Sequence, residues 1–170
     1  LGRPKGVEDN KLSLTPVYKF LKENLKTNIY FFMGDINNET KNKFAYLKEG
    51  EIILLENIRF FKEEGENDDN FAKRLAGLGE IYINDAFSCS HREQASIHKI
   101  TKYIKDSYAG PLVKKEITAI NTIIESKKEP VTCIIGGAKV STKINVICNL
   151  IKKFDNIIIV GGMANNFLSF

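Results

Sequence analysis

Short apolar runs alternate with amphipathic segments along this chain, and this alternation constrains its fold more than any other feature. The apolar runs have the length of strands, and glycine or asparagine follows each of them; they lie at 29–33, 51–56, 81–83, 131–135 and 156–160. Apolar residues recur at helical spacing in the segments between them, at 15–25, 39–48, 70–77, 112–126 and 144–151. Such alternation predicts an α/β fold with parallel strands and right-handed crossovers, whose ligands bind at the carboxyl ends of the strands.

Two local details sharpen this prediction. Thr15, which Pro16 follows, and Ser141 are expected to cap the helices that start beside them. The uninterrupted apolar centres of 51–56, 131–135 and 156–160 predict buried strands, and the first of these is expected to be buried on both faces.

The stretch VTCIIGGAKVSTK at 131–143 is typical of an anion-binding loop. Gly136 and Gly137 would let a ligand approach the backbone closely, and Lys139 and Lys143 would add positive charge beside a helix N-terminus that already favours phosphate. The stretch matches neither GxxxxGK[ST] nor GxGxxG. A purely structural strand, turn and lysine-bearing helix therefore stays open.

Arginine is rare in this chain, although lysine is common. Of the 25 basic residues, arginine occurs only at positions 3, 59, 74 and 92. Arg74 falls in a predicted helix and is expected to be a surface charge, whereas the other three fall in predicted loops. Because a guanidinium binds phosphate or carboxylate with two parallel hydrogen bonds, the three could converge on one multiply charged anion. Pairing with acidic residues of their own domain remains the alternative.

Composition excludes several other classes. The net charge of +4 is spread without a long basic block, which does not suggest nucleic-acid or membrane-surface binding, and no apolar run is long enough to cross a membrane. Cys89, Cys133 and Cys148 lack metal-type spacing and are expected to be reduced, buried thiols of a cytosolic protein.

Other polar features predict structure rather than chemistry. The acidic segment 63–69 predicts a solvated loop that caps the helix expected at 70–77, rather than a metal site. His91 lies in a polar loop and could act as a general base, but a structural hydrogen-bonding role is commoner, and the same holds for His98.

Six motifs together resemble phosphoglycerate kinase, in order and with suitable spacing. They are LGRPKG at 1–6, EIILLENIRFFKEE at 51–64, YINDAFSCSHREQAS at 82–96, AGPLVKKE at 109–116, IIGGAKVSTKI at 134–144 and VGGMANNFL at 160–168. The resemblance covers the whole chain, whereas the chain covers only the middle of the family.

The resemblance implies parts of two Rossmann-like domains, each a three-layer α/β/α parallel sheet, joined by a hinge helix. Residues 1–111 would form an incomplete phosphoglycerate-binding domain, residues 112–130 the interdomain helix and linker, and residues 131–170 the start of the nucleotide-binding domain. The implied strand order of the first domain is 3-4-2-1-5-6, with its two central strands before Leu1. We therefore expect this piece alone to expose apolar strand edges, to fold poorly and to be inactive.

The resemblance also implies a glycolytic reaction, the reversible transfer of a phosphoryl group between ATP and the carboxylate of 3-phosphoglycerate that gives ADP and 1,3-bisphosphoglycerate. The implied substrate-binding residues are Gly2, Arg3, Arg59 and Arg92. The implied nucleotide-binding residues are Gly136, Gly137, Ala138, Lys139, Lys143, Gly161 and Gly162, with Lys139 as the catalytic residue that stabilises the transferring phosphoryl group. Mg²⁺ would arrive with the nucleotide, without a metal ligand predicted here. The full-length protein would be a cytoplasmic monomer without nucleic-acid or membrane partners.

Three positions depart from the family pattern. Ser88 replaces the glycine usual after NDAF, Gln94 the histidine usual two residues past Arg92, and Val160 the first glycine of GGGM. A non-catalytic anion-binding module that retains the fold is the alternative function. A dinucleotide oxidoreductase would instead carry GxGxxG with an acidic residue about twenty positions further on, where this loop has GGAKVS.

Overall fold

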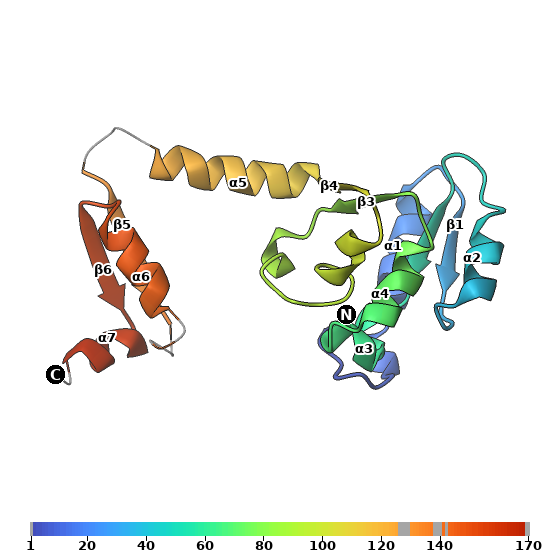
Figure 1. Ribbon diagram of the computed structural model, residues 1–170, viewed down its shortest axis with the longest axis horizontal. Coiled ribbons are helices and arrows are strands. Elements are labelled where there is room, and N and C mark those ends of the chain that lie inside the picture. The colour runs from blue at the N-terminus through green and yellow to red at the C-terminus, as the bar shows by residue number, and fades with distance from the viewer. Residues whose placement is uncertain (1, 126–129, 138–140, 142, 169–170) are drawn as a thin grey trace. The chain divides into compact units, whose positions relative to one another are not determined.

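The computed structural model describes residues 2–125, 130–137, 141 and 143–168, and the chain forms two compact units, Leu1–Lys114 and Lys115–Phe170 (Figure 1). Every strand pair is parallel, so the predicted α/β class is confirmed. No helix among the described residues has the length and apolar character needed to span a membrane.

The first unit follows the predicted alternation as far as residue 84 and adds a strand at 106–109 that the sequence pattern did not predict. Its strands are β1 (Ile29–Phe32), β2 (Ile52–Leu55), β3 (Ile81–Asn84) and β4 (Asp106–Ala109). Its helices are α1 (Thr15–Asn24), α2 (Asn38–Phe44), α3 (Lys62–Gly65), α4 (Asp69–Ala76) and the first turn of α5 (Pro111–Ile124). Short 3-10 turns lie at Asn10–Leu12, Ile58–Phe60, Phe87–Cys89 and Lys99–Lys102.

The four strands of this unit form two separate parallel pairs, β1 with β2 and β3 with β4. In the implied order 3-4-2-1-5-6, β1 to β4 would be strands 3, 4, 5 and 6. Strands 3 and 4 are neighbours in that order, and so are strands 5 and 6, which agrees with the observed pairs. Apolar strand residues stay exposed, as expected, including Ile81 at 61% and Ile83 at 60%. The prediction that 51–56 is buried on both faces is wrong, because Ile52 is 36% exposed and the other three residues of β2 are only half-buried.

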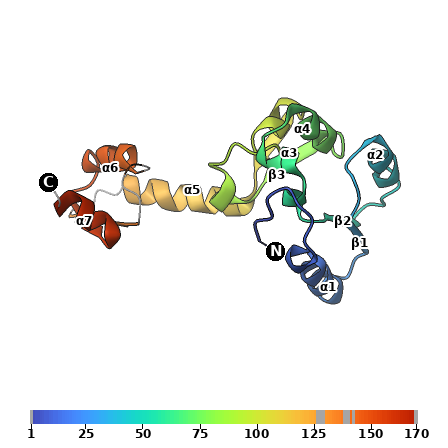
Figure 2. The ribbon, with the colours of Figure 1, turned by 90° about the horizontal axis from the view of Figure 1, so that it is seen from below.

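The β1–β2 pair lies between two helices (Figure 2). The ring of Phe31 stacks on Tyr18 of α1, with centroids 5.4 Å apart. The next residue, Phe32, meets Phe44 of α2 edge to face at 5.2 Å. Successive strand residues point to opposite faces, so α1 and α2 cover opposite faces of β1 and build a local helix–strand–helix sandwich.

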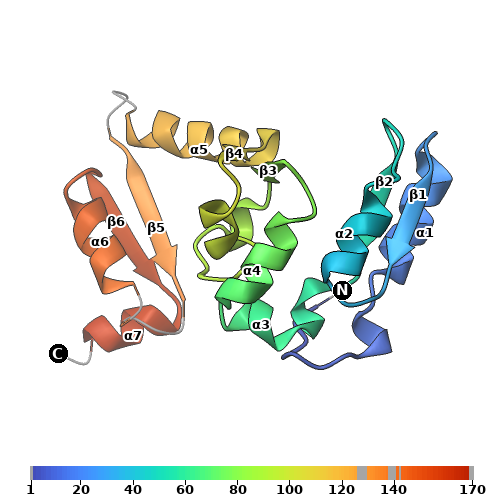
Figure 3. The same ribbon diagram turned by 45° about the vertical axis from the view of Figure 1, so that its right-hand side comes forward.

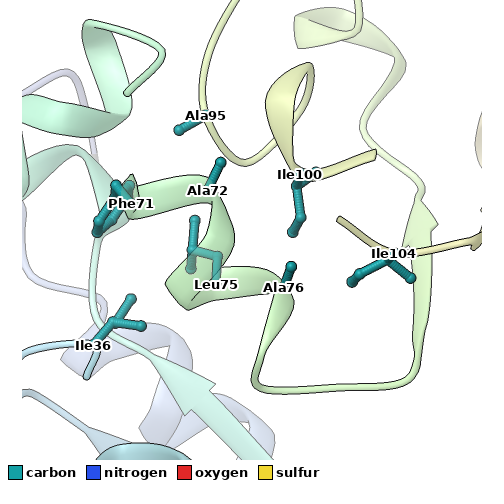
Figure 4. Packing of buried hydrophobic residues seen from close by; sticks show 8 residues of the cluster. All are labelled: Ile36, Phe71, Ala72, Leu75, Ala76, Ala95, Ile100 and Ile104. Atoms are coloured by element: carbon teal, nitrogen blue, oxygen red, sulfur yellow. The ribbon is translucent and has the colours of Figure 1, made fainter. Parts of the chain in front are cut away.

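The main hydrophobic core forms around α4, which α3 precedes along the chain (Figures 3 and 4). The Asp68 side chain caps α4 by accepting a hydrogen bond from Phe71 N at 2.7 Å, and Phe71 is fully buried. The cluster comprises Ile36, Phe71, Ala72, Leu75, Ala76, Ala95, Ile100 and Ile104. The residues from Ala95 to Ile104 thus pack on α4, which fixes the segment that carries Arg92.

The prediction of a solvated loop at 63–69 is wrong for the start of this segment, whereas its end caps the next helix as predicted, through Asp68. The first residues of the segment belong to α3, which spans Lys62–Gly65, and Glu64 is only 1% exposed. Its carboxylate accepts hydrogen bonds from Ser96 N at 2.9 Å and Ser96 Oγ at 2.6 Å. A carboxylate enters a protein interior only with such partners, and this partner lies 32 residues along the chain.

The helix predicted at 112–126 is α5, which begins at Pro111 and ends at Ile124, and its role as a hinge stays a prediction. Oδ1 of Asp85, which follows β3, accepts hydrogen bonds from Leu112 N at 2.6 Å and Val113 N at 3.1 Å. Asp85 therefore satisfies two of the amide groups that the first turn of a helix leaves without partners. The predicted linker at 127–130 falls largely outside the described residues.

The second unit contains β5 (Thr132–Gly136), α6 (Ile144–Ile151), β6 (Asn156–Val160) and α7 (Gly162–Leu168), with β5 and β6 paired in parallel. The prediction that both strands are buried is wrong: half-buried and exposed residues alternate along each strand, and Ile134 is 66% exposed.

The predicted helix caps also need correction. The helix α6 begins at Ile144 with Lys143 as its cap residue, so Ser141 does not cap it. Thr15 is the first residue of α1 rather than its cap. All three cysteines are free, but none is buried, because Cys89 and Cys133 are half-buried and Cys148 is exposed.

Candidate active site

The first unit brings Arg3, Arg59 and Arg92 together around one cavity of about 370 Å³. We call it the arginine pocket; its lining residues are Arg3, Pro4, Lys5, Gly6, Arg59, Phe61, Lys62, Gly65, Glu66, Arg92 and Gln94. Five of these side chains are cationic and one is acidic. The acidic one, Glu66, is paired with Lys62 at 2.9 Å, so the pocket carries a large excess of positive charge.

Arg59 lies in the 3-10 turn at the carboxyl end of β2, where the fold predicts a ligand. The buried Asn57 side chain fixes this turn, because its carbonyl accepts a hydrogen bond from Arg59 N at 3.2 Å and its amide donates one to Leu12 O at 3.0 Å. Arg59 O accepts a hydrogen bond from Gly6 N at 3.1 Å. The N-terminal loop that carries Arg3 is thereby tied to the turn that carries Arg59.

Glycine is required in that N-terminal loop. At Gly6, where φ is +74°, a Cβ would lie 2.8 Å from the Cα of Lys62. At Gly2, where φ is +135°, a Cβ would lie 2.8 Å from the Leu12 side chain. Gly2 does not line the pocket; it lets the chain pass close to Leu12 beside Arg3.

Glu56, the residue before Asn57, anchors the same end of β2. Its carboxylate accepts hydrogen bonds from Ser13 Oγ at 2.5 Å and from the backbone amides of Leu14 and Asn57 at 2.7 Å each. Partial burial raises the pKa of Glu56, but the hydrogen bonds from Ser13, Asn57 and Leu14 together outweigh burial and hold this pKa below its ordinary value.

Arg92 reaches the pocket from the turn that follows β3. Its backbone amide donates to Cys89 O at 3.0 Å. Among the described residues, Arg3, Arg59 and Arg92 form no salt bridge, so the alternative that they pair with acids of their own domain finds no support there. Arg74 is exposed, as predicted, and lies over the ring of Phe71 at 5.4 Å.

Glu64 is the residue that sequence reasoning missed. It follows the Arg59 turn, and its bonds to Ser96 join α3 to the segment that carries Arg92 and Gln94. Ala95 N donates to Glu64 O at 3.1 Å, and the Tyr82 hydroxyl donates to Ser96 O at 2.8 Å. Burial raises the pKa of Tyr82, so this hydroxyl stays a donor. A lone acidic residue followed much later by a serine gives no sequence signal for such a contact.

The histidines lie away from the pocket lining. His91 is exposed, and His98 Nδ1 lies 3.0 Å from the Asn67 side-chain amide. This arrangement favours the structural reading of His98 over general-base chemistry.

The second unit brings its predicted glycines together at the carboxyl edge of β5 and β6. Gly136 ends β5, and Gly161, with φ of +68°, joins β6 to α7. At Gly137, where φ is +149°, a Cβ would lie 2.8 Å from Lys143 Nζ. The Lys143 ammonium donates to Gly136 O at 2.8 Å. A Cβ at Gly162 would lie 4.0 Å from Gly137 O, so the two glycine turns are adjacent.

Ala138 and Lys139 lie outside the described residues, so their predicted roles stay predictions. No group of three or more His, Cys, Asp or Glu side chains within the described ranges could hold a metal ion. The glycine turns and Lys143 place backbone groups and one ammonium group at the carboxyl edge of β5 and β6, and such an arrangement can bind phosphate groups.

Comparisons with known proteins give one consistent result. The family model described as phosphoglycerate kinase matches residues 1–170. Phosphoglycerate kinases of Dictyoglomus turgidum and Wolbachia pipientis wMel are 49% and 46% identical over 168 and 169 residues, each alignment covering 99% of this chain. The chain spans 42% of the length of these relatives.

Solved structures agree. Phosphoglycerate kinase from Coxiella burnetii matches with a TM-score of 0.80 and 39% identity over 99% of this chain and 42% of that one. The enzyme from Pyrococcus horikoshii OT3 matches with a TM-score of 0.78 and 28% identity over 99% of this chain and 43% of that one.

Proposed function

Because the chain belongs to the phosphoglycerate kinase family, we propose that it carries the acceptor site and part of the nucleotide site of an enzyme that moves a phosphoryl group reversibly between ATP and the carboxylate of 3-phosphoglycerate. The products are ADP and 1,3-bisphosphoglycerate. The observation that carries this proposal is the arginine pocket, where three guanidinium groups from distant parts of the chain line one cavity.

The acceptor chemistry fits such a pocket. The 3-phosphoglycerate anion carries a phosphate at one end and the reacting carboxylate at the other. Arg3, Arg59 and Arg92 would bind the phosphate with charge-assisted, bidentate hydrogen bonds and leave the carboxylate free to attack. The gain in rate comes from positioning and neutralisation of charge, because phosphoryl transfer needs no nucleophilic side chain.

The nucleotide would bind at the glycine turns of β5 and β6. Gly136, Gly137, Gly161 and Gly162 would admit its phosphates close to the backbone, and Lys143 would release Gly136 O to bind them. We propose that Ala138 belongs to the same phosphate-binding loop. We also propose that Lys139 stabilises the negative charge on the transferring phosphoryl group. Mg²⁺ would enter on the phosphates of ATP or ADP, and we assign it no ligand among the described side chains.

The wider proposal follows the resemblance. Residues 1–111 would bind phosphoglycerate, residues 112–130 would link the domains, and residues 131–170 would begin the nucleotide domain; the compact units divide after Lys114, inside α5. We propose that the full-length protein acts in glycolysis, in the cytoplasm and as a monomer, and we propose no nucleic-acid or membrane partner.

A pair of arginine substitutions in the full-length protein tests this function. Arg59→Ala removes charge-assisted hydrogen bonding worth about 1.5–3 kcal/mol in total, so the KM for 3-phosphoglycerate should rise by roughly tenfold to a hundredfold while the KM for ATP stays unchanged. Arg74→Ala removes an exposed arginine that lies outside the pocket and should change neither constant. Steady-state assays with each substrate varied in turn measure both values.

Two results would contradict the proposal. If both substitutions had equal effects, the pocket would not be the acceptor site. If the unaltered protein bound 3-phosphoglycerate without turning it over in the presence of MgATP, the alternative of a non-catalytic anion-binding module would hold.

A further inference from the structure

Arg59 is held in the pocket by a neutral partner. Its Nη2 donates a hydrogen bond to Oε1 of Gln94 at 3.1 Å. The acidic residue that lines the same cavity, Glu66, instead pairs with Lys62. Because an amide oxygen accepts a hydrogen bond without cancelling charge, the guanidinium is oriented and still carries its full positive charge.

The backbone of Gln94 is fixed on every side. Its amide donates to Arg92 O at 3.0 Å, and its carbonyl accepts from Ile97 N at 3.0 Å and His98 N at 2.7 Å. The next residue, Ala95, is fully buried and bonded to Glu64 O. Gln94 therefore extends from an anchored turn that also carries Arg92, so its side chain sets the spacing between two of the three arginines.

We propose that Gln94 is a positioning residue, which orients the Arg59 guanidinium toward the phosphate of the bound acid without placing a negative charge beside it. This inference rests on the proposed function. One of the five guanidinium N–H groups is used by the amide, and the remaining ones stay available to the substrate. A carboxylate at position 94 would compete with the substrate for Arg59.

Two substitutions at position 94 of the full-length protein test this role. Gln94→Met keeps the length of the side chain but removes the acceptor, and the KM for 3-phosphoglycerate should rise about tenfold while kcat and the KM for ATP change much less. Gln94→Glu should raise the same KM at least as much, because its charge neutralises Arg59.

The outcomes separate the inference from the function on which it rests. An active unaltered protein whose KM for 3-phosphoglycerate is the same with Met or Glu at position 94 would overturn the positioning role and leave the proposed function standing. So would an equal rise in both KM values together with a lower melting temperature, because this would mark a merely structural residue. An unaltered protein without activity on 3-phosphoglycerate would overturn the proposed function, and the inference with it.

Discussion

Glu64 offers the sharpest test of how this structure holds its arginine pocket together. The buried carboxylate receives two hydrogen bonds from Ser96, through the backbone amide at 2.9 Å and the hydroxyl at 2.6 Å. Glu64→Ala would remove both bonds and leave the Ser96 amide buried without a partner. Glu64→Gln keeps the shape of the side chain and removes only its charge.

The expected magnitudes differ because the two substitutions leave different groups unpaired. Hydrogen bonds to a charged group contribute about 1.5–3 kcal/mol each, so Glu64→Ala should lower the free energy of unfolding by roughly 3–5 kcal/mol. In Glu64→Gln the side-chain carbonyl can still accept from Ser96 N, and the new amide can donate to Ser96 Oγ, which is also an acceptor. That substitution should cost only about 1 kcal/mol.

Urea unfolding of the full-length protein, followed by circular dichroism, measures these differences as a fall in midpoint at unchanged slope. Glu66→Gln is the matched control, because Glu66 lies two residues further on and is exposed, and its midpoint should stay close to that of the unaltered protein. If Glu64→Ala lowered the urea midpoint less than Glu64→Gln, or no more than Glu66→Gln, this prediction would be contradicted. The hydrogen bonds between Glu64 and Ser96 would then not be what joins these segments.

Two further predictions concern pH and the glycine turn. The folded pKa of Glu56 lies below its ordinary value near 4.5, so its contribution to stability is complete above the unfolded pKa and is lost as pH falls through the folded one. Stability should therefore drop on acidification below about pH 4.5, and Glu56→Gln should flatten that drop, as urea midpoints at several pH values would show. Gly137→Ala places a Cβ 2.8 Å from Lys143 Nζ at φ of +149°, so it should raise the KM for ATP at least tenfold without changing that for 3-phosphoglycerate. Gly79→Ala, where a Cβ has room, should change neither constant, and equal effects of the two would remove the role given to this turn.

Local patterns predicted the order and type of most elements. The apolar run at 29–33 became β1 and that at 156–160 became β6, because an apolar run of strand length between turn residues is specified by neighbours in sequence. Arg59 and Arg92 could be placed at strand ends for the same reason. Their meeting with Arg3 in one pocket was left open by the sequence, because Arg59 and Arg92 follow strands of two separate pairs.

Burial and capping were predicted less well. The strand at 131–135 was expected to be buried, yet Ile134 is largely exposed, because burial depends on which strands and helices pack against an element and not on its own composition. Ser141 is a good capping residue by type, but α6 begins after Lys143. Helix ends shift by a residue or two according to the tertiary contacts that the first turn makes.

By itself, the sequence determined the α/β class, the family and the residue types of the site, since these follow from periodicity and from motifs contiguous in the chain. Only the tertiary structure decided how the arginines are held. The partner of Arg59 is Gln94, 35 residues away, and the partner of Glu64 is Ser96, 32 residues away. A hydrogen bond between distant segments forms only when its donor and acceptor have the right distance and direction in space. The order of residues along the chain does not specify either of these.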